Sequence, residues 1–200
     1  MPGGAAVAGF WGKLPARGDF VGAGLPAAAV AVFEDWSRAA IAESRAALGE
    51  AWDARWMAAP IWRFRLGAAV AGPAPLAGLW LPSVDSVGRR FPLILAADAR
   101  HADDAWLDAV EALGLEAVTA DLDPDSLAGR LPPADAEAGA APLSRRSVWW
   151  TAGGPYRRAG RFEAVMLPAP ACFAAMLADG GCADAGRADD GCAAPGVSAA

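Results

Sequence analysis

The chain has 200 residues, 55% of them hydrophobic, and a formal net charge of −6 from 17 basic and 23 acidic side chains. This length fits one domain with a sizeable core, and nine tryptophans and seven phenylalanines argue against disorder over most of it. The acidic balance and the single lysine argue against binding to nucleic acid or to an anionic membrane, because both require clustered cationic side chains.

The first element expected along the chain is a strand. Residues 7–14, VAGFWGKL, place aromatic side chains at the centre of an apolar run, and Pro15 ends it because proline has no backbone N–H. The segment that follows, ARGDFVGAGLP, is glycine-rich and is predicted to be a loop that carries Arg17 and Asp19. Its glycines are mis-spaced for a dinucleotide fingerprint, and GKL lacks the rest of a phosphate loop.

Two helices follow. Residues 26–48 repeat apolar or small side chains at steps of three and four, which predicts a long helix that opens at a proline and stops before Gly49. Trp52 and Trp56 are four residues apart, which predicts a short helix with both rings on one face. Rings at this spacing usually belong to the core, and we predict the same for most tryptophans, with one or two left for a partner.

The middle of the chain predicts a sheet. Residues 61–67, IWRFRLG, alternate in polarity, which indicates a strand with one solvated face. A Gly/Pro turn and a second strand at residues 76–81 predict an antiparallel hairpin, and residues 91–97 are expected to continue the sheet.

A polar segment separates the last two of these strands within WLPSVDSVGRRFPLIL, residues 80–95. Two prolines bound it and predict an ordered loop that concentrates Ser83, Asp85, Arg89 and Arg90. Loops on a rigid scaffold often carry function. The simpler interpretation is an internal pair of Asp85 with Arg89 that fixes the loop, and the segment alone favours it.

The C-terminal half predicts a further helix with Asp103 or Asp104 as its N-cap, and a short helix that starts around Asp123. A Pro/Ala/Gly-rich segment, residues 132–142, is expected to be a mobile linker. Two paired strands at residues 146–151 and 161–167 and a last short helix from Pro170 complete the expected order of elements.

Targeting signals and cysteines bear on the compartment. No stretch approaches the ~20 consecutive apolar residues of a membrane span, and MPGGAAVAGF lacks the features of a secretory signal. We therefore expect a cytoplasmic protein without membrane insertion. Cys172, Cys182 and Cys192 fit no compact metal motif, and His101 is the only histidine, so reduced thiols and no cofactor are expected.

The catalytic case is weak. A serine–histidine–acid triad would have to use His101, and no serine sits in a G-x-S-x-G elbow. A carboxylate-only magnesium site built from aspartates such as Asp98 or Asp123 stays open, although no spacing supports it. The alternative to a non-enzymatic protein is a small hydrolase or nucleotide- or phosphate-binding protein that uses Asp19, Asp85 and Arg89.

Four motifs resemble the TagF family, also called ImpM, of type VI secretion-associated proteins. GFWGKLPARGDF at residues 9–20 resembles the family's N-terminal signature, and APIWRF at residues 59–64 resembles its APxWRF segment. PSVDSVGRRFPL at residues 82–93 resembles P-S-V-D-x-V-G-R-x-F-P-L, and VWW at residues 148–150 fits the late tryptophan pair. Four motifs in the family's order, over residues 7–178, make chance similarity improbable.

The departures are mild: Trp11 stands where the family often has tyrosine, and Arg90 where an aromatic residue is common. The resemblance implies a single α/β domain whose largely antiparallel central sheet has helices on both faces, of the longin type. It also implies a cytoplasmic, non-enzymatic accessory protein that represses type VI secretion post-translationally by binding another secretion component, such as a forkhead-associated scaffold protein. The oligomeric state stays open.

Because both polar loops belong to one family signature, we predict that residues 12–20 and 83–89 lie together at one edge of the sheet. The domain is expected to span residues 7–179, between disordered ends at residues 1–6 and 180–200. The candidate residues for interaction, or for holding this surface in shape, are Lys13, Arg17, Asp19, Ser83, Asp85 and Arg89.

Overall fold

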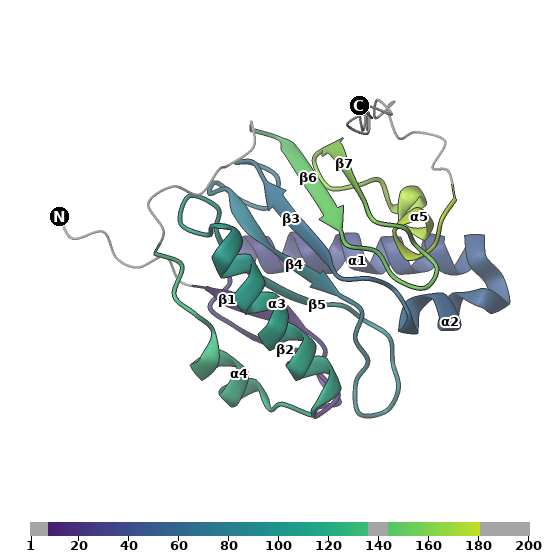
Figure 1. The fold of residues 1–200 in the computed structure, drawn as a ribbon, viewed down its shortest axis with the longest axis horizontal. Coiled ribbons are helices and arrows are strands. Elements are labelled where there is room, and N and C mark those ends of the chain that lie inside the picture. The colour runs from purple at the N-terminus through teal and green to yellow at the C-terminus, as the bar shows by residue number, and fades with distance from the viewer. Residues whose placement is uncertain (1–7, 136–143, 181–200) are drawn as a thin grey trace, which may run out of the picture.

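A seven-stranded antiparallel sheet forms the centre of the protein (Figure 1). The computed structural model describes residues 8–135 and 144–180. The strands lie in the order β2-β1-β5-β4-β3-β6-β7, and each neighbouring pair is antiparallel. Their bounds are β1 (Gly9–Gly12), β2 (Val21–Ala23), β3 (Trp62–Leu66), β4 (Leu76–Leu81), β5 (Leu93–Asp98), β6 (Arg146–Thr151) and β7 (Gly160–Val165).

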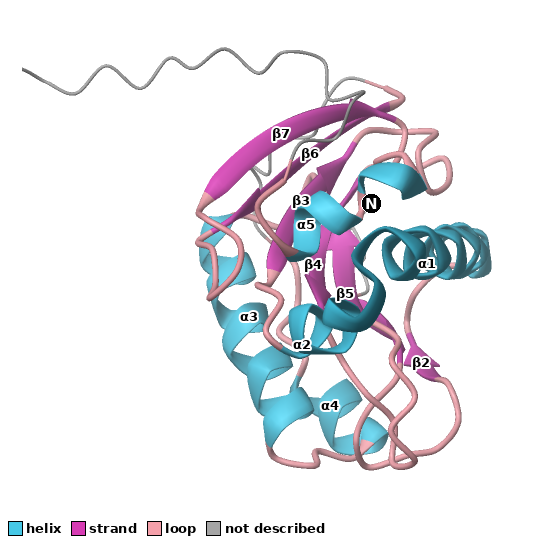
Figure 2. Ribbon diagram, turned by 90° about the vertical axis from the view of Figure 1, so that its right-hand side faces the viewer, coloured by secondary structure: helices cyan, strands magenta, loops and turns pink. Residues whose placement is uncertain are grey.

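Helices cover both faces of the sheet (Figure 2). One face carries α1 (Ala27–Leu48), α2 (Trp52–Met57) and α5 (Ala174–Leu177), and the other carries α3 (Asp104–Thr119) and α4 (Pro124–Arg130). Short 3-10 segments, Gly49–Ala51 and Pro170–Cys172, lead into α2 and α5. This arrangement confirms the predicted single α/β domain, and the likeness to longin domains stays a prediction.

The two faces hold different cores. Tryptophan and phenylalanine dominate the core beneath α1, α2 and α5, whereas the core beneath α3 and α4 is mostly leucine and alanine. The central strands β4 and β5 are buried on both faces, which explains their continuous apolar sequence. Eight of the nine tryptophans are buried and Trp150 is partly buried, which confirms that most of them are core residues. That one or two of them contact a partner stays a prediction.

The predicted helix ends are confirmed. Helix α1 follows Pro26 and ends at Gly49, whose positive φ of 52° suits a residue without a side chain. The Asp103 carboxylate accepts a hydrogen bond from the backbone N–H of Trp106 at 2.7 Å and thereby caps α3. Asp123 caps α4 in the same way.

The predicted loop after β1 contains a strand that the sequence did not indicate. Residues 21–23 form β2, which pairs with β1 so that Phe10 lies opposite Ala23. Three residues, one of them glycine, are too few to show an alternating pattern. The backbone pairing with β1 therefore defines this edge strand, and local preference does not.

The prediction of a solvated face on β3 is confirmed only in part, because the side chains on that face are partly buried against α3. Arg63 forms ion pairs with Asp108 at 2.8 Å and Glu111 at 2.6 Å, and Arg65 pairs with Asp104 at 3.0 Å. The alternation in the sequence is correct, but the polar side chains face acidic groups of a helix as well as water.

Several expectations concern residues outside the described ranges. The predicted disorder at residues 1–6 and beyond Gly180, and most of the predicted linker at residues 132–142, lie there. Cys172 is disulfide-bonded, so the prediction of reduced thiols is wrong for this residue; cysteine spacing alone does not reveal pairing. Across residues 8–135 and 144–180, every helix is too short or too polar to cross a bilayer.

Candidate functional site

The two polar loops of the family signature leave the sheet at the same end. Strand β1 ends at Gly12, which lies opposite Leu93, the first residue of β5. Since the two strands are antiparallel neighbours, the loop after β1 (residues 13–20, the first signature loop) meets the loop before β5 (residues 82–92, the second signature loop). The predicted proximity of these loops is confirmed.

Backbone contacts join the two loops directly. The N–H of Lys13 donates to the carbonyl of Pro92 at 3.3 Å, and the N–H of Ser86 donates to the carbonyl of Arg17 at 3.1 Å. A Cβ atom on Gly12 would lie 2.0 Å from the Pro92 oxygen, and the φ of Gly12 is 145°. Only glycine fits so close an approach of two backbones.

A buried ion pair between Lys13 and Asp85 ties the loops together. The Lys13 Nζ lies 2.5 Å from Asp85 Oδ2 and also donates to the carbonyl of Gly18 at 3.0 Å. Asp85 Oδ2 further accepts from Nε of Arg89 at 2.6 Å, and Oδ1 accepts from the backbone N–H groups of Val87 at 3.0 Å and Arg89 at 2.8 Å. The Asp85 side chain is 0% exposed and that of Lys13 only 6%.

The donors around Asp85 determine its protonation. Burial by itself would raise the pKa of this carboxyl, because it penalises the charged form. The hydrogen bonds from Lys13, from the backbone and side chain of Arg89, and from the backbone of Val87 outweigh burial and hold the pKa well below its usual range. Asp85 is therefore a charged structural acceptor and a poor proton acceptor near neutral pH.

Ser83 connects the same site to helix α2. Its hydroxyl donates to the carbonyl of Lys13 at 2.7 Å, and its own carbonyl accepts from the indole N–H of Trp56 at 3.0 Å. Ser83 is buried, and Trp56 stacks on Trp52 at a centroid distance of 5.2 Å. The signature loops are thus fastened to the aromatic core as well as to each other.

The remaining candidates lie at the surface. The Arg89 side chain, 60% exposed, bridges the loops because it binds Asp85 through Nε and the Gly18 carbonyl through Nη2. Arg17 and Asp19 are exposed, and neither forms an ion pair with a described residue. The two loops therefore meet at the site, but the side chains of Arg17 and Asp19 stay outside the ion-pair network around Asp85.

An aromatic cluster that the sequence did not indicate covers the ion pair. Phe20 stacks on Trp11 at 5.2 Å and meets Phe91 edge-on at 4.8 Å, and the Lys13 Nζ lies 4.8 Å from the centre of the Phe20 ring. Phe20 ends the first signature loop and Phe91 lies near the end of the second. Both phenylalanines belong to the two family motifs, which is the feature of the sequence that marks them. Which rings touch depends on the register of β1 and β5, and the motifs do not contain that information.

The contacts of Asp85 bear on the hydrolase alternative. Both of its oxygens already accept two hydrogen bonds each. Within residues 8–135 and 144–180, no group of three or more His, Cys, Asp or Glu side chains is placed to hold a metal. The buried contacts of Lys13, Ser83 and Asp85 fix the two signature loops, so the site is a surface with a fixed backbone.

Comparisons with known proteins agree with the motifs. The family model described as TagF N-terminal domain, type VI secretion system-associated, matches residues 9–133. The crystal structure of PA0076 from Pseudomonas aeruginosa PAO1 is similar to this chain with a TM-score of 0.77 and 27% sequence identity, over 96% of this chain and 100% of that one. Among curated proteins, no sequence matches the chain.

Proposed function

Because the chain belongs to the TagF family of type VI secretion-associated proteins, we propose that it is a cytoplasmic, non-enzymatic regulator that represses secretion by binding another secretion component. Family membership establishes the accessory role in type VI secretion. We propose, beyond this role, that the protein represses secretion, and we propose a direct partner and a surface that contacts it.

The observation that supports binding over catalysis is the state of Asp85. Its oxygens accept four hydrogen bonds, so they are not free to activate water or bind a ligand as a hydrolytic site would require. The same hydrogen bonds fix the backbone of both signature loops. A surface that is rigid before its partner arrives loses less entropy on association. The surface proposed for the partner is therefore the exposed rim of these loops, where Arg17 and Asp19 project without ion pairs to described residues.

The proposed partner is a protein of the secretion apparatus, and a forkhead-associated scaffold protein is the first candidate. Affinity capture from the native host with the intact protein as bait should recover it. The same capture with Arg17→Ala and Asp19→Ala combined should recover much less, because exposed and unpaired side chains are available for contacts with a partner. A matched control is Arg146→Ala, an exposed arginine that begins β6 and forms no ion pair with any residue that the structure describes.

Repression is tested by secretion itself. Deleting the protein should raise the amount of a type VI substrate in the culture medium, and overproducing it should lower that amount. Unchanged secretion in both strains would contradict repression, whatever the capture experiment finds. If the combined Arg17 and Asp19 variant still represses fully, the partner binds elsewhere on the molecule.

A further inference from the structure

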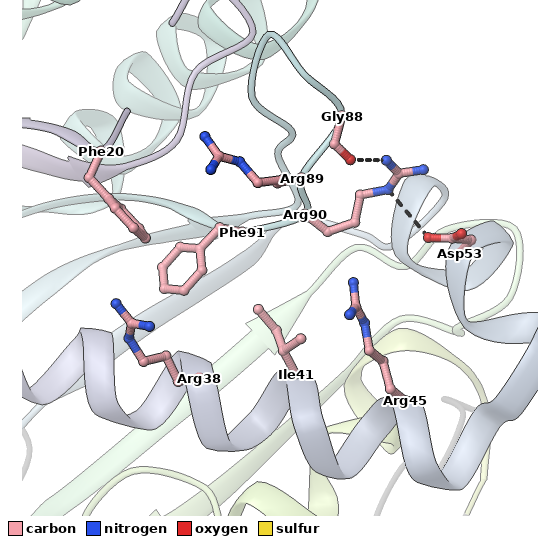
Figure 3. A pocket seen from close by; sticks show the side chains of 9 residues that line it. All are labelled: Phe20, Arg38, Ile41, Arg45, Asp53, Gly88, Arg89, Arg90 and Phe91. Atoms are coloured by element: carbon pink, nitrogen blue, oxygen red, sulfur yellow. Dashed lines mark hydrogen bonds and ion pairs between the residues drawn. The ribbon is translucent and has the colours of Figure 1, made fainter. Parts of the chain in front are cut away.

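Beside the second signature loop lies a cavity of about 500 Å³ whose lining is strongly cationic. Figure 3 shows Arg38 and Arg45 projecting from helix α1 toward the loop that carries Arg89 and Arg90. Asp53, at the start of α2, is the only acidic side chain of this lining. We call the space between these residues the arginine cavity. Its charge contrasts with the net charge of −6 of the whole chain.

The floor of the arginine cavity is apolar. Ile41 lies between the two arginines of α1, and Phe91 and Phe20 close the side next to the signature loops (Figure 3). Phe91 is buried, whereas Phe20 is 40% exposed. A ligand in this space would meet guanidinium groups at its edges and hydrocarbon beneath it.

The arginines of the cavity retain unused donors. Arg38 pairs with Glu34 one helical turn away at 2.5 Å, an exposed pair of the kind that adds little stability. Arg45 stacks over the Trp52 ring at 4.2 Å, and no carboxylate among the described residues lies within ion-pair distance of it. Each guanidinium carries five N–H donors, so both arginines can bind a carboxylate without giving up these contacts.

Arg90 is held in place but incompletely satisfied. Its Nη1 donates to the carbonyl of Gly88, and its Nε lies 3.4 Å from Asp53 Oδ1 (Figure 3). That Nε is shielded from solvent and has no hydrogen-bond partner of good geometry among the described residues. A shielded donor of this kind is out of reach of a ligand in the cavity, so the donors available to a ligand are those of exposed arginines such as Arg38 and Arg45.

The spacing of the arginines favours an elongated ligand over a small anion. Arg38 and Arg45 are seven residues apart on α1, which corresponds to about 10.5 Å along the helix axis. An extended chain covers that distance in about three residues. Two arginines so far apart do not converge on one phosphate, but they can each pair with a different carboxylate of one chain.

We infer that the arginine cavity binds an extended acidic segment of a protein partner. Carboxylates of the segment pair with Arg38 and Arg45, and an apolar side chain between them packs on Ile41 and Phe91. Arginine is the residue type most suited to such planar, two-point recognition, and it is enriched among the residues that dominate interfaces. This inference rests on the proposed function, because it assigns a chemistry to the partner.

The test uses the full chain and a short synthetic peptide rich in glutamate with one central phenylalanine. Binding is measured by fluorescence anisotropy, with the same peptide carrying glutamine in place of glutamate as the neutral reference. Arg38→Gln combined with Arg45→Gln should weaken binding of the glutamate peptide by about tenfold or more. Arg146→Gln combined with Arg161→Gln removes the same charge from exposed positions on β6 and β7, and should leave binding unchanged. Thermal unfolding confirms that both variants are folded.

Other outcomes overturn the inference. Absence of binding, equal weakening by the two double variants, or binding of the glutamine peptide with the same affinity would each do so. Inorganic phosphate that binds as tightly as the peptide assigns the cavity to a small anion. A dimer in sedimentation that the Arg38 and Arg45 variant abolishes assigns it to a second copy of the chain.

Secretion distinguishes failure of this inference from failure of the proposed function. If the deletion strain shows raised secretion but the Arg38 and Arg45 variant restores repression completely, the protein is a repressor and binding at the arginine cavity is not required for repression. If deletion leaves secretion unchanged, the proposed function fails even where the peptide binds at the cavity.

Discussion

The signature loops and the arginine cavity lie side by side, but the charges of the loops are buried and paired whereas those of the cavity are exposed. In the loops, Lys13 and Asp85 are shielded from water and every oxygen of the carboxylate is occupied. In the cavity, Arg38 and Arg45 are exposed and retain free donors. Arg89 belongs to both, since it binds Asp85 and also lines the cavity. The first arrangement fixes a backbone, whereas the second offers groups to another molecule.

The largest difference between the two regions is expected in stability. Asp85→Ala should lower the free energy of unfolding by about 3–5 kcal/mol, because it leaves the Lys13 ammonium buried without its counter-charge. Urea unfolding measures this change. Asp19→Ala, in the same loops but exposed, should change stability by no more than about 0.5 kcal/mol. Similar losses in both variants would mean that the ion pair does not fix the loops.

A second, smaller effect should appear at low pH. The folded-state pKa of Asp85 lies below the value of about 3.9 for an unfolded aspartate, so its contribution to stability is present above that pH and is lost as the pH falls through the folded pKa. The free energy of unfolding should therefore fall as the pH drops below about 4, and the fall should be shallower in Asp85→Ala.

The control for this pH effect is Asp179, whose pKa is lowered to about 2 by hydrogen bonds from the backbone of Arg158 and the side chain of Arg157. Asp179 is exposed, so its ion pairs with the two arginines contribute less to the free energy of unfolding than the buried pair of Lys13 and Asp85 does. Asp179→Asn should reduce the loss of unfolding free energy below pH 4 by less than Asp85→Ala does. The reverse order would place the main acid-sensitive contact at the C-terminal end of the described chain.

The smallest effect is expected for the cavity. Arg38→Gln combined with Arg45→Gln removes one exposed ion pair and two contacts of a guanidinium with an aromatic ring, so stability should change by no more than about 1 kcal/mol in urea unfolding. A loss comparable to that of Asp85→Ala would show that these arginines hold the fold together. The contrast between the two regions would then disappear.

Local patterns predicted most of the elements. The three- and four-residue repeat before Gly49 gives α1, and the alternation in β3 and the short turn before β4 give an antiparallel hairpin. Capping aspartates mark the starts of α3 and α4. These features depend on neighbours in the sequence, which is why spacing and turn chemistry suffice to find them.

The site could be predicted only in part. The paired motifs indicated that the loops meet, but Lys13 and Asp85 are 72 positions apart and their contact depends on the pairing of β1 with β5. The same limit applies to β2, which its pairing with β1 defines, and to Arg63, whose acidic partners lie on the distant helix α3. The arginine cavity combines α1 with a distant loop, so no single stretch of sequence contains it.

Lys13 is the only lysine of the chain and only 5% exposed, which makes its ε-amine a natural reporter of motion at the signature loops. An amine-reactive reagent can modify this side chain only when the loops separate, since the ammonium is otherwise enclosed by Asp85, the Gly18 carbonyl and the Phe20 ring. The rate of modification at Lys13 therefore measures local opening free energy directly, without an added probe. A partner that seats on the loops would slow that reaction in proportion to its occupancy.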